Sequence, residues 1–108
     1  MISVEIYKTN AGFIKRFFIT GHAGYAQEGS DIVCAAVSML AQTIALALQH
    51  LLKVPITLKL DKGNMDCALP VDYIGQHDVQ LLLEAMELGL RNIEQGYKEY
   101  IKVFEKGE

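Results

Sequence analysis

One long apolar segment, residues 32–52, restricts the possible folds of this chain more than any other feature. Aliphatic residues fill most of it, and the polar residues that share a narrow stripe at helical spacing are Cys34, Ser38, Gln42 and Gln49. Ser30 or Asp31 is expected to cap this helix, since a side-chain oxygen there can accept hydrogen bonds from the free first-turn amides. With so little polar surface, the helix is expected to be buried nearly all round.

The rest of the chain alternates between strand and helix patterns. The strand pattern covers four segments, residues 2–6, 13–20, 56–60 and 65–69. Turn residues at 9–12 and 61–64 join these strands into two hairpins. A helix pattern follows over 79–97, and residues 101–104 suit a short last strand. The order ββαββα(β) predicts an α+β fold in which two helices pack against a mainly antiparallel sheet.

The length of the chain predicts a single domain, residues 1–108, because no Pro-rich or Ser-rich linker divides it. A core in so short a chain leaves much of its surface exposed, whereas 51% of the residues are hydrophobic. The apolar excess predicts a homodimer, since two copies can bury between them what one copy leaves exposed.

Charge and polarity exclude several classes of protein. Lys and Arg number 10 against 13 Asp and Glu, and the formal charge of -3 offers no broad basic surface for nucleic acid. The polar residues within segment 32–52 disfavour a membrane span, and residues 1–7 alternate apolar and polar, unlike a signal peptide. We therefore expect a soluble, cytoplasmic protein with no direct contact to nucleic acid or membrane.

The two cysteines and three histidines are scattered along the chain. They form no CxxC or HxxxH spacing, so no disulfide scaffold, metal site or other cofactor is expected. Cys67 lies within an alternating strand and is interpreted as structural. His50 and His77 lie at helix ends, where a polar surface role is the simpler interpretation.

The segment just before the long helix, together with the first turn of that helix, contains the residues for which a catalytic role is predicted. Residues 21–30 hold three glycines and no periodic pattern, which predicts a loop. With Asp31 as cap, Cys34 takes the third helical position, where free amides and the helix dipole stabilise a thiolate. His22 lies in the loop and can fold back to act as the base of Cys34, which predicts a cysteine peptidase. First-turn amides, or amides of the loop, are then expected to hold the oxyanion.

Each of these residues also has a structural interpretation. A cysteine in an apolar helix is most often a packing residue, so Cys34 is compatible with a purely structural role. Asp31 serves either as a cap alone or also as the group that orients His22. Ser38, one turn after Cys34, bonds the carbonyl at position 34, lines a pocket or packs.

Two stretches are informative together: GHAGYA at residues 21–26 and DIVCAAVS at residues 31–38, with Gly29 between them. They resemble the ribosomal-processing cysteine protease family of bacteria, and the length and element order agree over essentially the whole chain. The resemblance implies a dyad of Cys34 and His22 that removes a short N-terminal extension from large-subunit ribosomal protein number twenty-seven. Asp31 and Ser38, which are typical of the motif, are then expected to support or orient the dyad.

The resemblance also implies a homodimer and a glycine-rich loop that forms or gates the substrate site. The loop residues expected at the substrate are Gly21, Gly24, Tyr25, Ala26 and Gly29. The family's target is an apolar, aromatic segment that ends in two phenylalanines and is cut before a small residue. Loop closure over such a peptide is expected to exclude water and to align the dyad.

Two other functions fit part of the pattern. A noncatalytic peptide-binding module of ribosome assembly would use the same loop, but it has no need of both a helix-start thiol and a neighbouring histidine. A redox protein or thiol transferase would need a resolving cysteine, for which Cys67 is the single candidate. The pattern therefore favours the peptidase.

Overall fold

A computed structural model describes residues 1–107 and confirms the predicted order of elements. The elements are β1 (Ile2–Lys8), β2 (Ile14–Thr20), α1 (Ile32–His50), β3 (Thr57–Asp61), β4 (Asn64–Ala68), the short 3-10 helix η1 (Val71–Tyr73), α2 (His77–Gly96) and β5 (Ile101–Lys106). The fold is therefore α+β, with the last strand formed. Only η1 had no counterpart in the sequence pattern, since three residues are too few to show a period.

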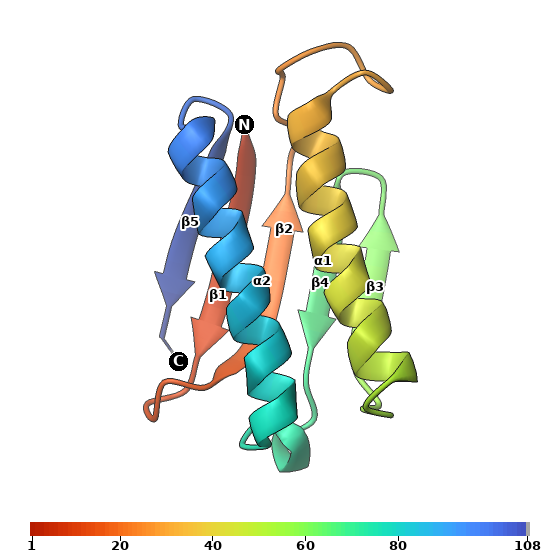
Figure 1. Cartoon of the computed structure of the whole chain (residues 1–108), viewed down its shortest axis with the longest axis vertical. Helices are drawn as coiled ribbons and strands as arrows, with labels where there is room; N and C mark the ends of the chain where they lie inside the picture. The colour runs from red at the N-terminus through yellow and green to blue at the C-terminus, as the bar shows by residue number, and fades with distance from the viewer. Residues whose placement is uncertain (108) are drawn as a thin grey trace.

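The five strands form one sheet in the order β3-β4-β2-β1-β5 (Figure 1). Neighbouring strands are antiparallel except β1 and β5, which pair in parallel. Each helix therefore joins two strands that run in the same direction: α1 connects β2 to β3, and α2 connects β4 to β5. Such connections cross over a face of the sheet, and both helices lie on the same face.

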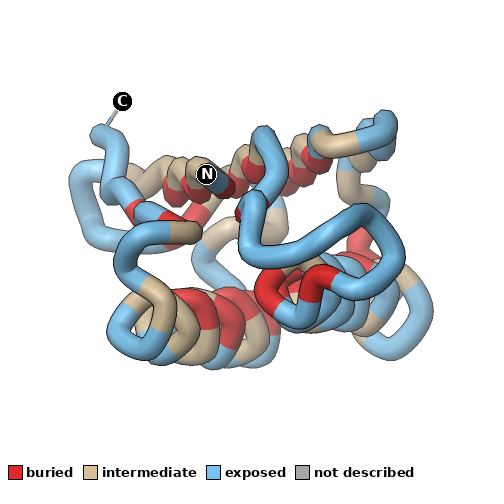
Figure 2. Tube along the Cα trace, turned by 90° about the horizontal axis from the view of Figure 1, so that it is seen from above, coloured by how far each residue is buried: buried red, intermediate tan, exposed pale blue. Residues whose placement is uncertain are grey.

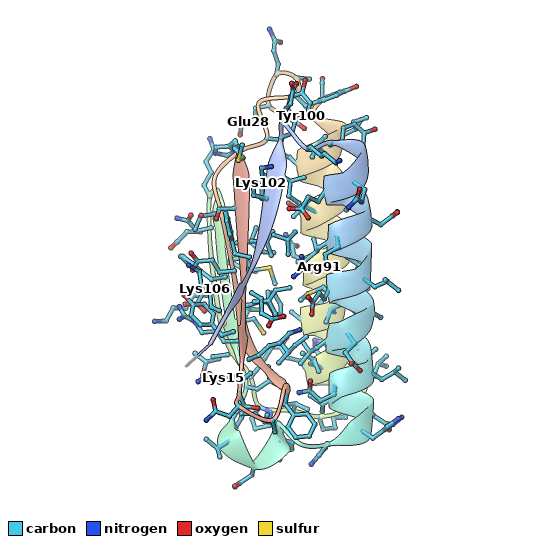
Figure 3. All side chains as sticks on the ribbon, turned by 90° about the vertical axis from the view of Figure 1, so that its left-hand side faces the viewer. Lys15, Glu28, Arg91, Tyr100, Lys102 and Lys106 are labelled. Atoms are coloured by element: carbon cyan, nitrogen blue, oxygen red, sulfur yellow. The ribbon has the colours of Figure 1, made fainter. Side chains whose placement is uncertain are left out.

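The sheet and the helices form two layers, with the core between them (Figure 3). Alternation in β1 turns Ile2, Val4 and Ile6 toward the helices, where each is almost completely buried. Among residues 1–107, no helix lies over the opposite face of the sheet. This is why the strands show the two-residue period from which they were predicted.

Helix α1 is less buried than predicted. The expectation that it is buried nearly all round is wrong for the single chain, because six of its 19 residues are buried. Its outward side exposes Ile32, Met39 and Leu46, spaced seven residues apart. In Figure 2 the buried positions of both helices face the sheet. A two-layer fold covers only one side of a helix, so the outer side of α1 stays open.

By length and composition alone, α1 is also apolar enough to cross a membrane, with a mean hydropathy of 1.9. The polar residues within it disfavour a span but do not exclude one by themselves. Of that apolar window, 33% is buried in the fold, and the core helix of a soluble protein meets the same criterion. The criterion is weak evidence for a span.

Candidate active site

The start of α1 is held by Asp31, one of the two caps that the sequence allowed. Its Oδ1 accepts the N–H groups of Val33 and Cys34, both at 3.0 Å. Its Oδ2 accepts the N–H groups of Tyr25 at 3.0 Å and Ala26 at 3.3 Å. These bonds, that from Cys34 first, hold the pKa of the Asp31 carboxyl below its usual range. One carboxylate therefore fixes both the helix start and the loop before it.

Three amides at the start of α1, one of the two expected sources of oxyanion donors, are already engaged. The N–H groups of Val33 and Cys34 donate to the Asp31 carboxylate. The N–H of Ala35 donates to the Asp31 carbonyl at 3.0 Å. By contrast, the loop N–H of Ala23 donates to Sγ of Cys34 at 3.3 Å. The amide donor at the sulfur therefore comes from the loop.

Two cavities meet at Cys34, and His22 and Ser38 line both of them. The first, of about 180 Å³, lies between α1 and the β3–β4 hairpin, and its apolar walls are Ile2, Ile19, Val37, Ala41, Leu60 and Met65. The second, of about 390 Å³, lies under the loop and is also lined by Gly24, Ala26, Glu28, Gly29, Asp31 and Ala35. The structure thus brings the two predicted dyad residues to shared cavities. Within residues 1–107 no hydrogen bond joins their side chains.

The loop is attached at two further points. The N–H of Gly21 donates to the carbonyl of Gly63 in the β3–β4 turn at 2.9 Å. The ring of Tyr25 contacts Tyr97 and Tyr100 edge-on, with centroids 5.6 and 5.1 Å away. Such edge-to-face contacts are favourable for aromatic rings. Tyr25 thus anchors the loop near the start of β5, and its predicted place at the substrate stays a prediction.

The other predicted residues take ordinary structural places. Cys67 has no exposed surface, and burial, with a smaller effect of the Asp66 charge, raises the pKa of its thiol to about 12. His50 is the last residue of α1, and His77 is the first of α2. Among residues 1–107, no three His, Cys, Asp or Glu side chains gather in a way that could hold a metal ion.

Two residues at the site were missed in the sequence. Ala23 acts through its backbone N–H, which no side-chain pattern can reveal. Gly63 was recognised as a turn residue, but its place beside the loop depends on the pairing of Thr20 with Asn64 across strands far apart in sequence. For Gly63, the only available signal was a glycine within the predicted turn at residues 61–64.

Known proteins resemble this chain in sequence over nearly its whole length. The sequence model of the family described as cysteine protease Prp matches residues 1–102. The ribosomal processing cysteine protease Prp of Bacillus subtilis is 32% identical over 107 residues, which cover 95% of this chain and 96% of that protein. The protein of the same name from Staphylococcus aureus is 27% identical over 103 residues.

Solved structures agree with the sequence relatives. A crystal structure of Prp from S. aureus, described as an essential ribosomal processing protease with a covalently linked product peptide, matches with a TM-score of 0.92 at 28% identity. That match covers 98% of this chain and 100% of the other. A Streptococcus mutans protein matches with a TM-score of 0.87 at 30% identity, covering 100% of this chain and 96% of the other.

Proposed function

The chain belongs to the cysteine protease Prp family, whose members are cysteine peptidases of ribosomal processing, and from this premise we propose that Cys34 is its nucleophile and His22 its general base. The observation that carries the proposal is that both side chains line the same two cavities at the start of α1. Cys67, the other thiol, is enclosed in the core and has no access to a substrate.

The proposed reaction has two steps. The Cys34 sulfur, having given its proton to His22, attacks the scissile carbonyl carbon and forms a C–S bond. His22 returns the proton to the leaving amine nitrogen as the C–N bond breaks, which leaves a thioester on Cys34. Water then attacks the thioester while His22 takes its proton, and the Cys34 thiolate leaves. The products are a carboxylic acid and an amine, as peptide hydrolysis requires.

The N–H of Ala23 is our proposed oxyanion donor. It already points at Sγ of Cys34, so the oxygen of a carbonyl carbon bonded to that sulfur would come within its reach. The N–H groups of Val33 and Cys34 donate to Asp31 and would have to break these bonds to serve as oxyanion donors. A donor on the loop also makes catalysis depend on the position of the loop.

The two cavities support a peptide that passes over Cys34. One S. aureus relative has been solved in complex with a substrate peptide. In this chain the smaller cavity is lined by apolar side chains together with polar ones such as Gln42, Asp61 and Asn64, and its apolar part suits the apolar, aromatic segment expected before the cut. The proposed substrate is accordingly the N-terminal extension of large-subunit ribosomal protein number twenty-seven.

The exposed side of α1 supports the proposal of a homodimer. Ile32, Met39 and Leu46 form an apolar stripe on the outside of the helix layer. Two copies that pair through this stripe would remove it from water. In analytical ultracentrifugation we expect a dimer that Met39→Lys converts to monomer, and a wild-type monomer at every concentration would contradict the proposal.

The remaining parts of the proposal concern the setting of the enzyme. We expect residues 1–108 to act as one peptidase domain in the cytoplasm, without direct contact to nucleic acid or membrane. The family match over residues 1–102 supports a single unit. The formal charge of -3 supports the expectation about nucleic acid.

A cleavage assay tests the proposed function. Purified protein is incubated with a peptide that spans the expected extension and its cut point, and the products are identified by mass spectrometry. We expect cleavage by wild type and by Cys67→Ala, and none by Cys34→Ala or His22→Ala. Cleavage by all four proteins would overturn the proposed dyad. Cleavage by none of them would overturn the proposed substrate.

A further inference from the structure

The turn between β3 and β4 lies against the residue that carries the proposed base. Thr20, at the end of β2, pairs with Asn64, which places the turn beside the start of the loop. The N–H of Gly21 then donates to the Gly63 carbonyl at 2.9 Å. His22 is the next residue, so its backbone leaves from a point that is fixed to the turn.

The imidazole of His22 also packs on Gly63 itself. A methyl group placed on the Cα of Gly63 would lie 3.1 Å from Nε2 of His22 and 3.4 Å from Cε1. Ordinary contact between nonbonded carbon atoms is about 3.5–4.0 Å, so the ring could not keep its place beside any larger residue. His22 is otherwise exposed, and Gly63 therefore forms a wall on one side of its ring.

We propose that Gly63 is a positioning residue for His22. By its contact with the ring, Gly63 holds the imidazole within the cavity that Cys34 lines. The proposal rests on the proposed function in one respect, namely that His22 is the base. Gly63 also lines the smaller cavity, but the role proposed for it is exerted through the imidazole ring of His22. A shift of the ring by a few tenths of an ångström would misalign the proton transfer while the peptide still binds.

Glycine is required at position 63 for two separate reasons, and the chain offers a control that separates them. Gly63 has a φ of 82°, in the left-handed region that disfavours larger residues, and it also lacks room for a Cβ. Gly12, in the β1–β2 turn, has nearly the same φ, 89°, but nothing lies within 4 Å of a Cβ placed there. Substitutions at the two positions share the backbone strain and differ in the contact with His22.

The experiment compares Gly63→Asn with Gly12→Asn, because asparagine tolerates a positive φ better than other residues with a Cβ. The peptide cleavage assay gives kcat and KM, urea unfolding gives stability, and NMR reports the His22 imidazole shifts. We expect Gly63→Asn to lower kcat roughly tenfold. Its KM should stay within about twofold and the His22 signals should move. Gly12→Asn should lose similar stability but keep kcat within about twofold of wild type.

The outcomes separate this proposal from the proposed function. If His22→Ala still cleaves the peptide, the dyad fails and the positioning proposal fails with it. If His22→Ala is inactive but Gly63→Asn has the kcat of Gly12→Asn, only the positioning proposal fails. Should Gly63→Asn not fold, Gly63→Ala with Gly12→Ala provides the same contrast with a smaller side chain.

Discussion

The two cysteines of this chain, Cys34 and Cys67, occupy opposite kinds of environment. Cys34 lies in the first turn of α1, is partly exposed, and accepts a hydrogen bond from the N–H of Ala23 at its sulfur. Cys67 lies in the middle of β4, between the sheet and the helices, with no exposed surface. The side chain is the same in both places, so the difference between the proposed nucleophile and a core residue comes from position in the fold.

The carboxylates next to these cysteines differ in the same way. Asp31 binds four backbone amides and so connects the helix start to the loop. Asp66, beside Cys67, forms a two-pronged ion pair with Arg16 on the open face of the sheet, with both N–O distances 2.8 Å. One carboxylate organises the site, and the other joins two strands.

Thiol reactivity should show the largest difference between the two cysteines. A thiol with a pKa of about 12 is ionised at pH 7 in about one molecule in 10⁵, and Cys67 is also enclosed. We expect iodoacetamide to label Cys34 at least about 10³-fold faster than Cys67 in the folded protein. Peptide mapping by mass spectrometry gives both rates, and labelling in urea is the control in which they should converge. Equal labelling rates of Cys34 and Cys67 in the folded protein would contradict the difference in environment described above.

Replacement of Asp31 should have the next largest effect. Asp31→Ala releases the cap and the loop together, which should cost about 1 kcal/mol of stability. It should also lower kcat/KM at least about tenfold, because the loop that Asp31 holds also contains His22, the proposed base, and the amide of Ala23. Urea unfolding and the cleavage assay measure the two effects.

Asp31→Asn is the matched variant for this test. An amide has one oxygen that accepts and one nitrogen that donates, so Asn can serve only one of the two pairs of N–H groups. Its kcat/KM should fall between those of wild type and Asp31→Ala. Full activity of Asp31→Ala would show that the loop needs no such anchor.

Removal of the buried sulfur should affect stability alone. Cys67→Ala leaves a small cavity in the core and should cost about 1 kcal/mol in urea unfolding. Cys34→Ala should cost less than half of that, because its side chain is only partly buried. Cleavage per folded molecule should be unchanged in Cys67→Ala. A loss of cleavage in Cys67→Ala without unfolding would give the core thiol a role that the structure does not suggest.

Acid should reduce the stability that the ionised carboxylates of Asp31 and Asp66 contribute. The amides around Asp31, and the Arg16 guanidinium beside Asp66, hold the pKa of these carboxyls below the usual value of about 3.9. A depressed pKa in the folded state contributes stability above the unfolded value and loses it as pH falls through the folded value. The difference in unfolding free energy between wild type and either Asp31→Asn or Asp66→Asn should therefore narrow below about pH 4 in urea unfolding. Only Asp31→Asn should also lower cleavage at neutral pH, and a gap that widens in acid would contradict this account.

The smallest effect is expected at the exposed end of the loop. Lys62, in the β3–β4 turn, forms an ion pair with Glu28 at 3.2 Å, and both side chains are more than 75% exposed. Figure 3 shows Glu28 at one tip of the molecule. Glu28→Gln should change stability by less than about 0.5 kcal/mol and kcat by less than about twofold, since exposed pairs contribute little. A large loss of cleavage would mean that this pair, rather than Asp31, holds the loop.

Local patterns were sufficient for the elements of the fold. Alternation gave β1, β3 and β4, and enrichment in aromatic residues and Ile gave β2. The helical period gave α1 and α2 within a few residues of their observed ends. Asp31 was recognised as a possible cap because capping depends on residues at most three positions away. The burial of α1 was overestimated, because composition does not say how many layers will cover a helix.

The residues of the candidate site could be predicted only in part from local sequence patterns. Cys34 stood out from its place at a helix start, and His22 from its glycine-rich loop, and the family motif joined them. The direction of the Ala23 amide, the engagement of the first-turn amides by Asp31 and the contact of Gly63 with His22 were not predicted. Each depends on how segments distant in sequence meet.

The sequence by itself thus determined the kinds of element and their order, and it singled out the thiol proposed as nucleophile. These follow from local periodicity and from a cysteine's place relative to a helix start. Only the tertiary structure decided the strand order β3-β4-β2-β1-β5, and with it the meeting of the β3–β4 turn and the His22 loop. The physical reason is that strand pairing is set by backbone hydrogen bonds and by core packing across the whole chain. No short window of residues contains that information.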